Sequence, residues 1–266
     1  MNVFQGRLAM VTGAGDGIGA MLARGLAGWG MRVCVQDIRA DAAQGVADEI
    51  GEGAFPLVFD VSDREACVTA ADALHDKGDP LSFLWINAGV GAGASLLTGR
   101  PNVIEWAFSV NALGMIWTAQ TFVPLMTDTK GPRHVGFTAS SASLRPPGGD
   151  LPLYPATKHA SFAIADGLGA ELAKQDIAST LLCPGLLNTN IWDGARARPD
   201  RFGGVRRMDP AIADRWNKAK SPALMWPHIE RTVLSGGGYL TCAPDESTAV
   251  EAADYARAIQ NSIVRI

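Results

Sequence analysis

The chain has 266 residues, 47% of them apolar and 19% charged, with a formal net charge of −4. This composition excludes a disordered chain, and the small negative charge gives no electrostatic reason to expect a nucleic-acid partner. The four cysteines form no CxxC pair, the histidines show no ligand spacing, and the first residues do not resemble a secretory leader. We therefore expect no metal site and a cytosolic protein.

Short apolar runs rich in β-branched residues alternate with longer helical patterns along the chain. Strands are predicted at residues 8–12, 32–36, 55–59, 81–86, 134–139, 177–182 and 238–241. Helices are predicted at 18–29, 40–50, 63–77, 103–126, 155–174 and 250–263. Such alternation is typical of a parallel sheet covered on both faces. We predict an α/β fold, a single-domain Rossmann-like doubly wound parallel sheet flanked by helices, over residues 1–266.

Two segments need separate comment. Residues 106–127 carry no charge and are long enough to span a bilayer, but Asn111, Gln120 and Pro124 interrupt them. A buried or subunit-interface helix is the better interpretation, and we expect no membrane partner. Residues 190–221 follow the sixth strand and mix Arg, Asp, Gly and Pro with aromatic residues. We predict that they form a substrate lid at the carboxyl edge of the sheet.

A glycine-rich stretch, TGAGDGIG at 12–19, lies between the first predicted strand and helix. Glycines there allow a tight turn and let a pyrophosphate approach the helix N-terminus. The alternative is a plain tight turn. The cofactor-binding candidates in this stretch are Gly13, Asp16, Gly17, Ile18 and Gly19.

The second strand runs into Asp37, 18 residues after Gly19. An acid in this place can accept hydrogen bonds from the adenosine ribose and repel a 2′-phosphate, and Asp16 adds a second negative charge. Arg39 argues in the opposite direction, and Asp37 could also cap the following helix. We predict NAD rather than NADP as the cofactor.

Tyr154 and Lys158 stand four residues apart at the start of a helix, and Ser141 precedes the tyrosine by 13 residues. Reduction of a ketone needs a proton donor, and the pKa of a free tyrosine is too high for ready exchange at neutral pH. A nearby ammonium and a positive nicotinamide ring would lower it. Ser141 can orient the substrate oxygen; the adjacent Ser140 is the alternative, and the spacing favours Ser141.

With these motifs the chain resembles the short-chain dehydrogenase/reductase family, over about residues 7–190. Further matching motifs are Asp60-Val61, Asn87-Ala88-Gly89, Asn111, and Pro184-Gly185 with Thr189. The resemblance implies the following contacts. Asp60 and Val61 would contact adenine, and Asn87, Ala88 and Gly89 would line the cofactor. Asn111 would hold a water that links Lys158 to solvent. Pro184, Gly185 and Thr189 would hold the nicotinamide, and Lys158 its ribose.

Some of these residues have plainer explanations. Asn87 and Asn111 could satisfy interior backbone groups, and Thr189 could be only a helix N-cap. The chain departs from the family pattern at Ile86, at Leu144 and at its C-terminal ending. That ending and residues 121–126 are similar to a bacterial branch that oxidises benzylic alcohols of lignin-derived aryl ethers.

The leading hypothesis is an NAD-dependent oxidoreductase that interconverts a secondary alcohol and a ketone on a lipophilic, ring-containing substrate. A hydroxysteroid, an aryl alcohol and a terpenoid alcohol all fit. The alternatives are a non-catalytic NAD-binding sensor or scaffold, and an epimerase or dehydratase of the same fold. The family resemblance also implies a homodimer or homotetramer. The apolar pocket candidates, each equally well explained as core, are Leu144, Leu151, Leu153, Leu187, Ile191, Trp192, Met225 and Trp226.

Overall fold

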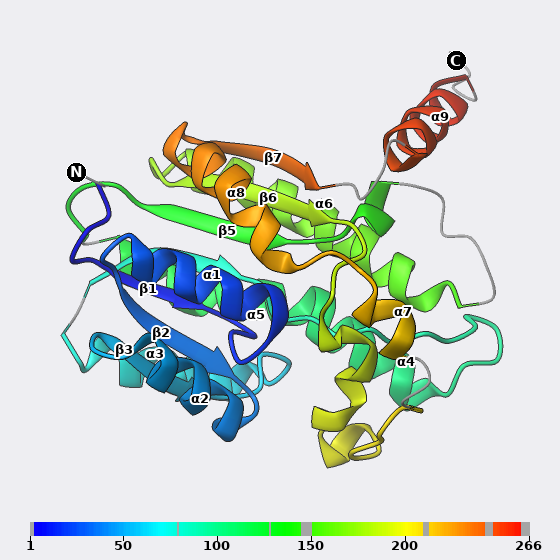
Figure 1. Ribbon diagram of the computed structural model, residues 1–266, viewed down its shortest axis with the longest axis horizontal. Coiled ribbons are helices and arrows are strands. Elements are labelled where there is room, and N and C mark those ends of the chain that lie inside the picture. Colours follow the sequence, from blue (N-terminus) through cyan, green and yellow to red (C-terminus); the bar gives the residue numbers. More distant parts are fainter. Residues whose placement is uncertain are drawn as a thin grey trace.

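Parallel strands form the centre of the computed structural model, which describes residues 3–78, 80–127, 129–144, 151–209, 213–242 and 247–261. Over these residues the sheet has seven strands in the order β3-β2-β1-β4-β5-β6-β7, and every neighbouring pair is parallel (Figure 1). The strands are β1 (Leu8–Val11), β2 (Arg32–Asp37), β3 (Ala54–Val58), β4 (Leu81–Ile86), β5 (His134–Thr138), β6 (Ala178–Pro184) and β7 (Gly237–Cys242). The order reverses between β1 and β4, which is the place where open α/β sheets bind ligands.

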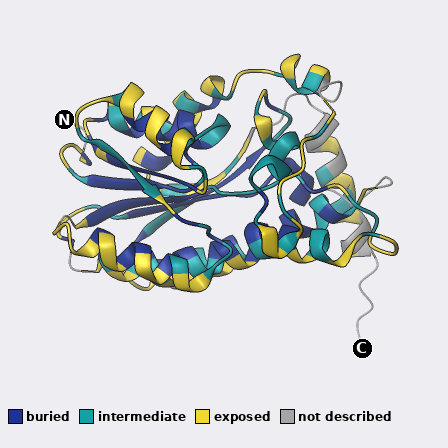
Figure 2. Ribbon diagram, turned by 90° about the horizontal axis from the view of Figure 1, so that it is seen from below, coloured by how far each residue is buried: buried dark blue, intermediate teal, exposed yellow. Residues whose placement is uncertain are grey.

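Helices cover both faces of the sheet, and Figure 2 shows the strands as a buried layer between them. The α-helices are α1 (Gly17–Gly28), α2 (Ala40–Ile50), α3 (Arg64–His75), α4 (Pro101–Phe108), α5 (Gly114–Phe122), α6 (Leu153–Ala173), α7 (Ala213–Asn217), α8 (Trp226–Leu234) and α9 (Ser247–Asn261). Shorter 3₁₀ segments are η2 (Val123–Met126), η3 (Ser141–Leu144), η4 (Asn190–Ala197), η5 (Asp200–Phe202) and η7 (Pro222–Met225). One π-helix, η1, spans Ser109–Leu113.

Two apolar clusters hold the layers together. On one face, residues of α1, α2 and α8 such as Leu22, Val46 and Ile229 are fully or almost fully buried against the sheet. On the other face, α3, α5 and α6 pack through side chains that include Leu74 and Phe122. The strand β4 is buried at all six positions, as expected for a parallel strand covered on both sides. The predicted fold class is confirmed.

Several predicted boundaries differ from the observed ones. The single helix predicted at 103–126 is a continuous helical run of α4, η1, α5 and η2. The helix α6 begins at Leu153, two residues before the predicted start, so Tyr154 lies in its first turn. The helix α8 was not predicted. Residues 145–150, 210–212 of the expected lid and 262–263 of the expected last helix lie outside the described residues.

The segment 190–221 contains η4, η5 and α7. Phe202 of this segment packs against the core, and Asn102 of α4 donates a hydrogen bond to the carbonyl of Phe202, at 2.9 Å. In the described part of the chain no helix is both long and apolar enough to cross a membrane.

Candidate active site

A cavity of about 420 Å³ opens where the central strands end at their carboxyl edge. It collects residues from the loops that follow β1, β2, β4, β5 and β6. The predicted residues that line it are Gly13, Asp16, Gly17, Ile18, Asp37, Asp60, Val61, Asn87, Ala88, Gly89, Ser141, Tyr154, Lys158, Pro184, Gly185 and Thr189. Gly19 and Asn111 are not among the lining residues, although both touch residues that are.

The side chain of Gln36 fixes the glycine-rich turn. Gln36 accepts a hydrogen bond from the backbone N–H of Gly13 at 3.1 Å and donates one to the carbonyl of Phe59 at 2.6 Å. A Cβ atom on Gly13, which has φ +61°, would lie 2.9 Å from the Cα of Ala88. One on Gly19 would lie 2.1 Å from the carbonyl oxygen of Gly13. Glycine is therefore needed at position 19 for α1 to pack closely against the turn. The role of Gln36 was not predicted from the sequence.

Thr12 and Asn87 join the turn to the end of β4. The hydroxyl of Thr12 accepts the backbone N–H groups of Asn87 and Ala88 at 2.9 and 3.0 Å. The side-chain amide of Asn87 donates to the carbonyl of Thr12 at 3.0 Å. The amide nitrogen of Asn87 thus satisfies a backbone carbonyl, as the simpler explanation holds. The residue also lines the cavity.

Asp37 is buried at the end of β2, with 7% of its surface exposed. Its carboxylate accepts the backbone N–H of Gly15 at 3.1 Å and that of Arg39 at 2.9 Å. The Arg39 side chain lies 3.5 Å from the same carboxylate. The N-cap residue of α2 is Arg39, and no side-chain hydrogen bond caps this helix. Asp37 therefore does not act as its cap. The carboxylate faces the cavity and is partly compensated by one arginine.

Two acids of the cavity are bound by arginines of the 190–221 segment. Asp16 caps α1 by accepting the N–H of Gly17 at 2.7 Å, and Arg196 donates to its other oxygen at 2.7 Å. Asp60 accepts the backbone N–H and the hydroxyl of Ser62, and Arg201 donates to it at 2.6 Å. The predicted second negative charge near the cofactor, Asp16, is therefore paired.

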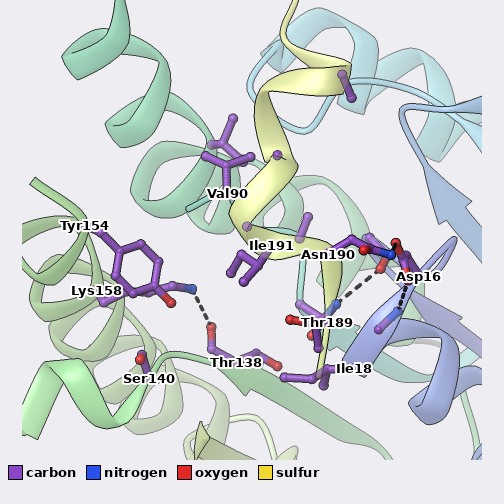
Figure 3. Close-up of a pocket in the computed structure, with 18 of the residues that line it drawn as sticks. Asp16, Ile18, Val90, Thr138, Ser140, Tyr154, Lys158, Thr189, Asn190 and Ile191 are labelled. Carbon is purple, nitrogen blue, oxygen red and sulfur yellow. Dashed lines mark hydrogen bonds between the residues drawn. The ribbon is translucent and has the colours of Figure 1, made fainter. Parts of the chain in front are cut away.

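Tyr154 and Lys158 lie one helical turn apart on α6 and face the cavity, opposite Thr189 and Ile191 (Figure 3). The Lys158 ammonium is 6.0 Å from the centre of the Tyr154 ring and 3.4 Å from the carbonyl oxygen of Thr138. Burial lowers the pKa of Lys158 to about 8, because the charged form loses its hydration. Burial likewise raises the pKa of Tyr154. The expected lowering of the tyrosine pKa is not produced by the chain's own groups.

Ser141, which the spacing favoured, and the adjacent Ser140 both line the cavity with Tyr154. A side-chain hydrogen bond with Ser140 partly opposes the burial effect on the pKa of Tyr154. The Ser140 hydroxyl also accepts the backbone N–H of Ala142 at 3.1 Å. Ser141 begins the 3₁₀ turn η3 and lines the same cavity. Both serines therefore stay candidates for orienting the substrate oxygen.

Asn111 lies in the π-helix η1, a type of irregularity that is frequent at functional sites. Its side chain accepts the backbone N–H of Val90 at 2.8 Å and donates to the carbonyl of Val90 at 3.0 Å. It also donates to the hydroxyl of Thr157, the neighbour of Lys158, at 2.9 Å. The structure therefore supports at least the simpler explanation, in which Asn111 ties the loop after β4 to α6.

Thr189 occupies the N-cap position of η4 but makes no capping hydrogen bond. Its methyl group packs on the turn, since a Cβ atom on Gly17 would lie 3.0 Å from it. Pro184 ends β6 and Gly185 follows it, and both line the cavity. The hydroxyl of Thr189 is thus left available to a ligand rather than used as a cap.

Apolar side chains form part of the cavity wall. Its apolar lining includes Val90, Trp106, Val110, Leu186, Leu187, Ile191 and Trp216. Of the pocket candidates named from the sequence, Leu187 and Ile191 are confirmed as lining. Met225 and Trp226 instead pack in the core beside α1, and Leu153 is fully buried in the opposite core. No group of three His, Cys, Asp or Glu side chains in the described ranges could hold a metal ion.

Comparison with known proteins agrees with this arrangement. A family model described as short chain dehydrogenase matches residues 7–200. The 1-deoxy-11-beta-hydroxypentalenate dehydrogenase of Streptomyces avermitilis is 32% identical over 215 residues, 79% of either chain. The C alpha-dehydrogenase of a Sphingobium species is 30% identical over 207 residues, 76% of this chain and 68% of that protein. A short chain dehydrogenase/reductase from Burkholderia phymatum, solved in complex with NAD, superposes with TM-score 0.88 and 25% identity over 100% of this chain and 98% of that chain.

Proposed function

Because the chain belongs to the short chain dehydrogenase family, we propose that it interconverts a secondary alcohol and a ketone, with NAD as its cofactor. The observation that carries this proposal is the position of Tyr154 and Lys158 in the same cavity as the glycine-rich turn and Asp37. A dinucleotide bound along the turn would extend from Asp37 towards Tyr154. The named activities of both curated relatives are dehydrogenations.

The residues present fit a dinucleotide. Gly13 and Gly15 leave a cradle that side chains would fill, since a Cβ atom on Gly15 would lie 2.7 Å from the Asp37 carboxylate. The backbone N–H groups of the first turn of α1 have no partner within the helix and can bind phosphate. The Thr189 hydroxyl suits the nicotinamide carboxamide. When bound, the cofactor accepts a hydride from the alcohol or donates one to the ketone.

Tyr154 is the proposed acid and base of the reaction. In oxidation its phenolate oxygen takes the hydroxyl proton of the alcohol, and in reduction the phenol returns a proton to the carbonyl oxygen. Burial raises the pKa of Tyr154, so positive charge near the ring is needed to make the phenolate accessible. Lys158 supplies an ammonium on the adjacent turn, and low dielectric strengthens its effect. Ser140 or Ser141 would hold the substrate oxygen.

Asp37 supports NAD over NADP. Its buried carboxylate lines the cavity at the end of β2, where the adenosine ribose would lie. A 2′-phosphate there would meet this negative charge. Arg39, which argued for NADP, is directed to Asp37 at 3.5 Å. The Burkholderia phymatum relative was solved with NAD.

A lipophilic, ring-containing substrate is supported by the apolar side chains that line the cavity. Trp106 and Trp216 contribute ring surface, and Ile191 and Val110 add apolar contact area. The cation beside Tyr154 is Lys158, 6.0 Å from the centre of its ring, and we assign Lys158 to the reaction itself. Hydroxysteroids, aryl alcohols and terpenoid alcohols would all match such a surface.

The test is turnover with NAD⁺ on a panel of steroidal, aromatic and terpenoid secondary alcohols, followed by NADH absorbance. We expect activity on one class and its loss in Tyr154→Phe, with NADH binding retained. Tight NADH binding without turnover of any alcohol would favour the sensor or scaffold. Substrate conversion without net NADH formation would favour an epimerase or dehydratase.

A further inference from the structure

The glycine-rich turn carries an acid in the place where the proposed cofactor needs positive charge. Asp16 immediately precedes α1, and its carboxylate accepts the N–H of Gly17 at 2.7 Å. A helix N-terminus attracts anions through its free N–H groups and its dipole. An ionised carboxylate at the same end would repel the pyrophosphate of a dinucleotide. Asp16 is therefore unfavourable for the proposed function unless its charge is compensated.

Compensation comes from the 190–221 segment, far away in sequence. Arg196 donates from Nη2 to Asp16 at 2.7 Å, and Asn190 donates to the same oxygen at 2.8 Å. Arg196 is itself held by the carbonyl of Asn190, which accepts from Nη1 at 2.8 Å. Figure 3 shows Asp16 and Asn190 together on the side of the cavity opposite Tyr154 and Lys158. Both Arg196 and Asp16 line that cavity.

The Arg196–Asp16 ion pair is partly exposed to water, which bears on whether it stabilises the fold or acts on the cofactor. The Arg196 and Asp16 side chains are 20% and 34% exposed, so water screens their attraction and the pair contributes little to folding stability. The same charges face the cavity, where a bound pyrophosphate would replace that water. A second pair, Arg201 with Asp60, ties the same segment to the end of β3. Arginines of the 190–221 segment therefore bind two acids, Asp16 and Asp60, that line the cavity.

We propose that Arg196 is a positioning residue for the cofactor: by neutralising Asp16 it lets the glycine-rich turn accept a pyrophosphate. This inference rests on the proposed dinucleotide cofactor. It makes the segment 190–221 part of the cofactor site as well as a cover for the substrate. It also makes Arg196 dispensable in a chain that lacks the acid at position 16.

The experiment is a double-mutant cycle of Arg196→Met and Asp16→Asn, read out as the dissociation constant of NADH by fluorescence without substrate. Asparagine keeps the helix cap while it removes the charge. We expect Arg196→Met to weaken NADH binding on the order of tenfold, and the double variant to bind within about threefold of the wild type. Arg206→Met, which removes an exposed arginine from the same segment, is the matched control and should leave binding unchanged.

Two outcomes would overturn the inference. One is wild-type affinity in Arg196→Met; the other is a double variant as weak as Arg196→Met alone, which would mean that the arginine acts by holding the segment in shape. Circular dichroism and thermal unfolding of each variant confirm that the comparison is made between folded proteins. Absence of NADH binding in the wild type would instead reject the proposed function, so the two failures are distinguishable.

Discussion

Lys158 donates from its buried ammonium group to the backbone carbonyl of Thr138, across 3.4 Å at the end of β5. Within the described residues, this long hydrogen bond is the ammonium group's one hydrogen bond to a protein oxygen. It does not replace lost hydration, and burial accordingly lowers the pKa of Lys158 to about 8. The cavity thus holds a cation that the fold by itself stabilises poorly.

Removal of that cation should stabilise the protein while it abolishes activity. Lys158 has a lower pKa in the folded chain than in the unfolded chain, so the unfolded chain binds more protons between about pH 8 and 10.5. The destabilising effect of Lys158 is therefore full below pH 8 and fades as the pH rises through that window. We expect Lys158→Met to raise the free energy of unfolding at pH 7 by an amount on the order of 3 kcal/mol, and by much less at pH 10. Urea denaturation at both pH values measures this, and equal gains would contradict it.

The two serines after β5 can be separated by substitution. Ser140 lowers the pKa of Tyr154, the proposed acid and base, against the larger effect of burial, whereas Ser141 begins the turn η3. We expect Ser140→Ala to lower kcat by about 10²-fold or more, the size of loss seen when one oriented donor is removed. Ser141→Ala is the matched control, with a loss of less than about tenfold. The reverse order, measured on the substrate found in the panel, would restore Ser141 to the role that its spacing predicted.

The residues proposed for catalysis could be identified from the sequence because each follows a strand or begins a helix. Tyr154 and Lys158 need only helical spacing to face the same side, and the glycine-rich turn needs only its place between β1 and α1. The strand–helix alternation predicted the parallel sheet, but not the order of its strands. The predicted cytosolic location and the homodimer or homotetramer stay predictions.

The remaining features depend on contacts between distant segments. Arg196 meets Asp16 across 180 positions of sequence, and no local pattern marks the pair. The π-helix at Asn111 shifts the register of an otherwise regular apolar helix, so periodicity predicted one uninterrupted element. Met225 and Trp226 belong to the core because α8 packs on α1, and that helix was not predicted at all.

Cofactor choice should depend on Asp37. Asp37→Ser removes the buried charge beside the proposed ribose position and leaves Arg39 free to meet a 2′-phosphate. We expect the ratio of kcat/KM for NADP to that for NAD to rise by about 10²-fold, since a charge–phosphate repulsion is exchanged for an attraction. The exposed Asp41 in the first turn of α2 provides the control, because Asp41→Ser removes an equal charge away from the cavity. An unchanged ratio in Asp37→Ser would reject the role of the carboxylate.

The contact of α8 with α1 gives a prediction about stability alone. Gly25 faces Trp226, and a Cβ atom there would lie 2.3 Å from the indole ring, which in turn packs against Trp29 with ring centres 5.3 Å apart. We expect Gly25→Ala to lower the free energy of unfolding by about 1–3 kcal/mol, as overpacking does. Gly45 on α2 is the matched helical position, since nothing lies within 4 Å of its Cβ site.

A methyl group at position 45 meets no neighbouring atom, so only helix propensity changes there. Gly45→Ala should therefore raise the free energy of unfolding by about 0.5–1 kcal/mol. Urea denaturation of both variants gives the two free energies. If Gly25→Ala were as stable as Gly45→Ala, the indole of Trp226 would have to lie elsewhere, and α8 would not pack on α1 in the observed way. Opposite signs for the same substitution would instead show that Trp226, rather than helix propensity, requires glycine at position 25.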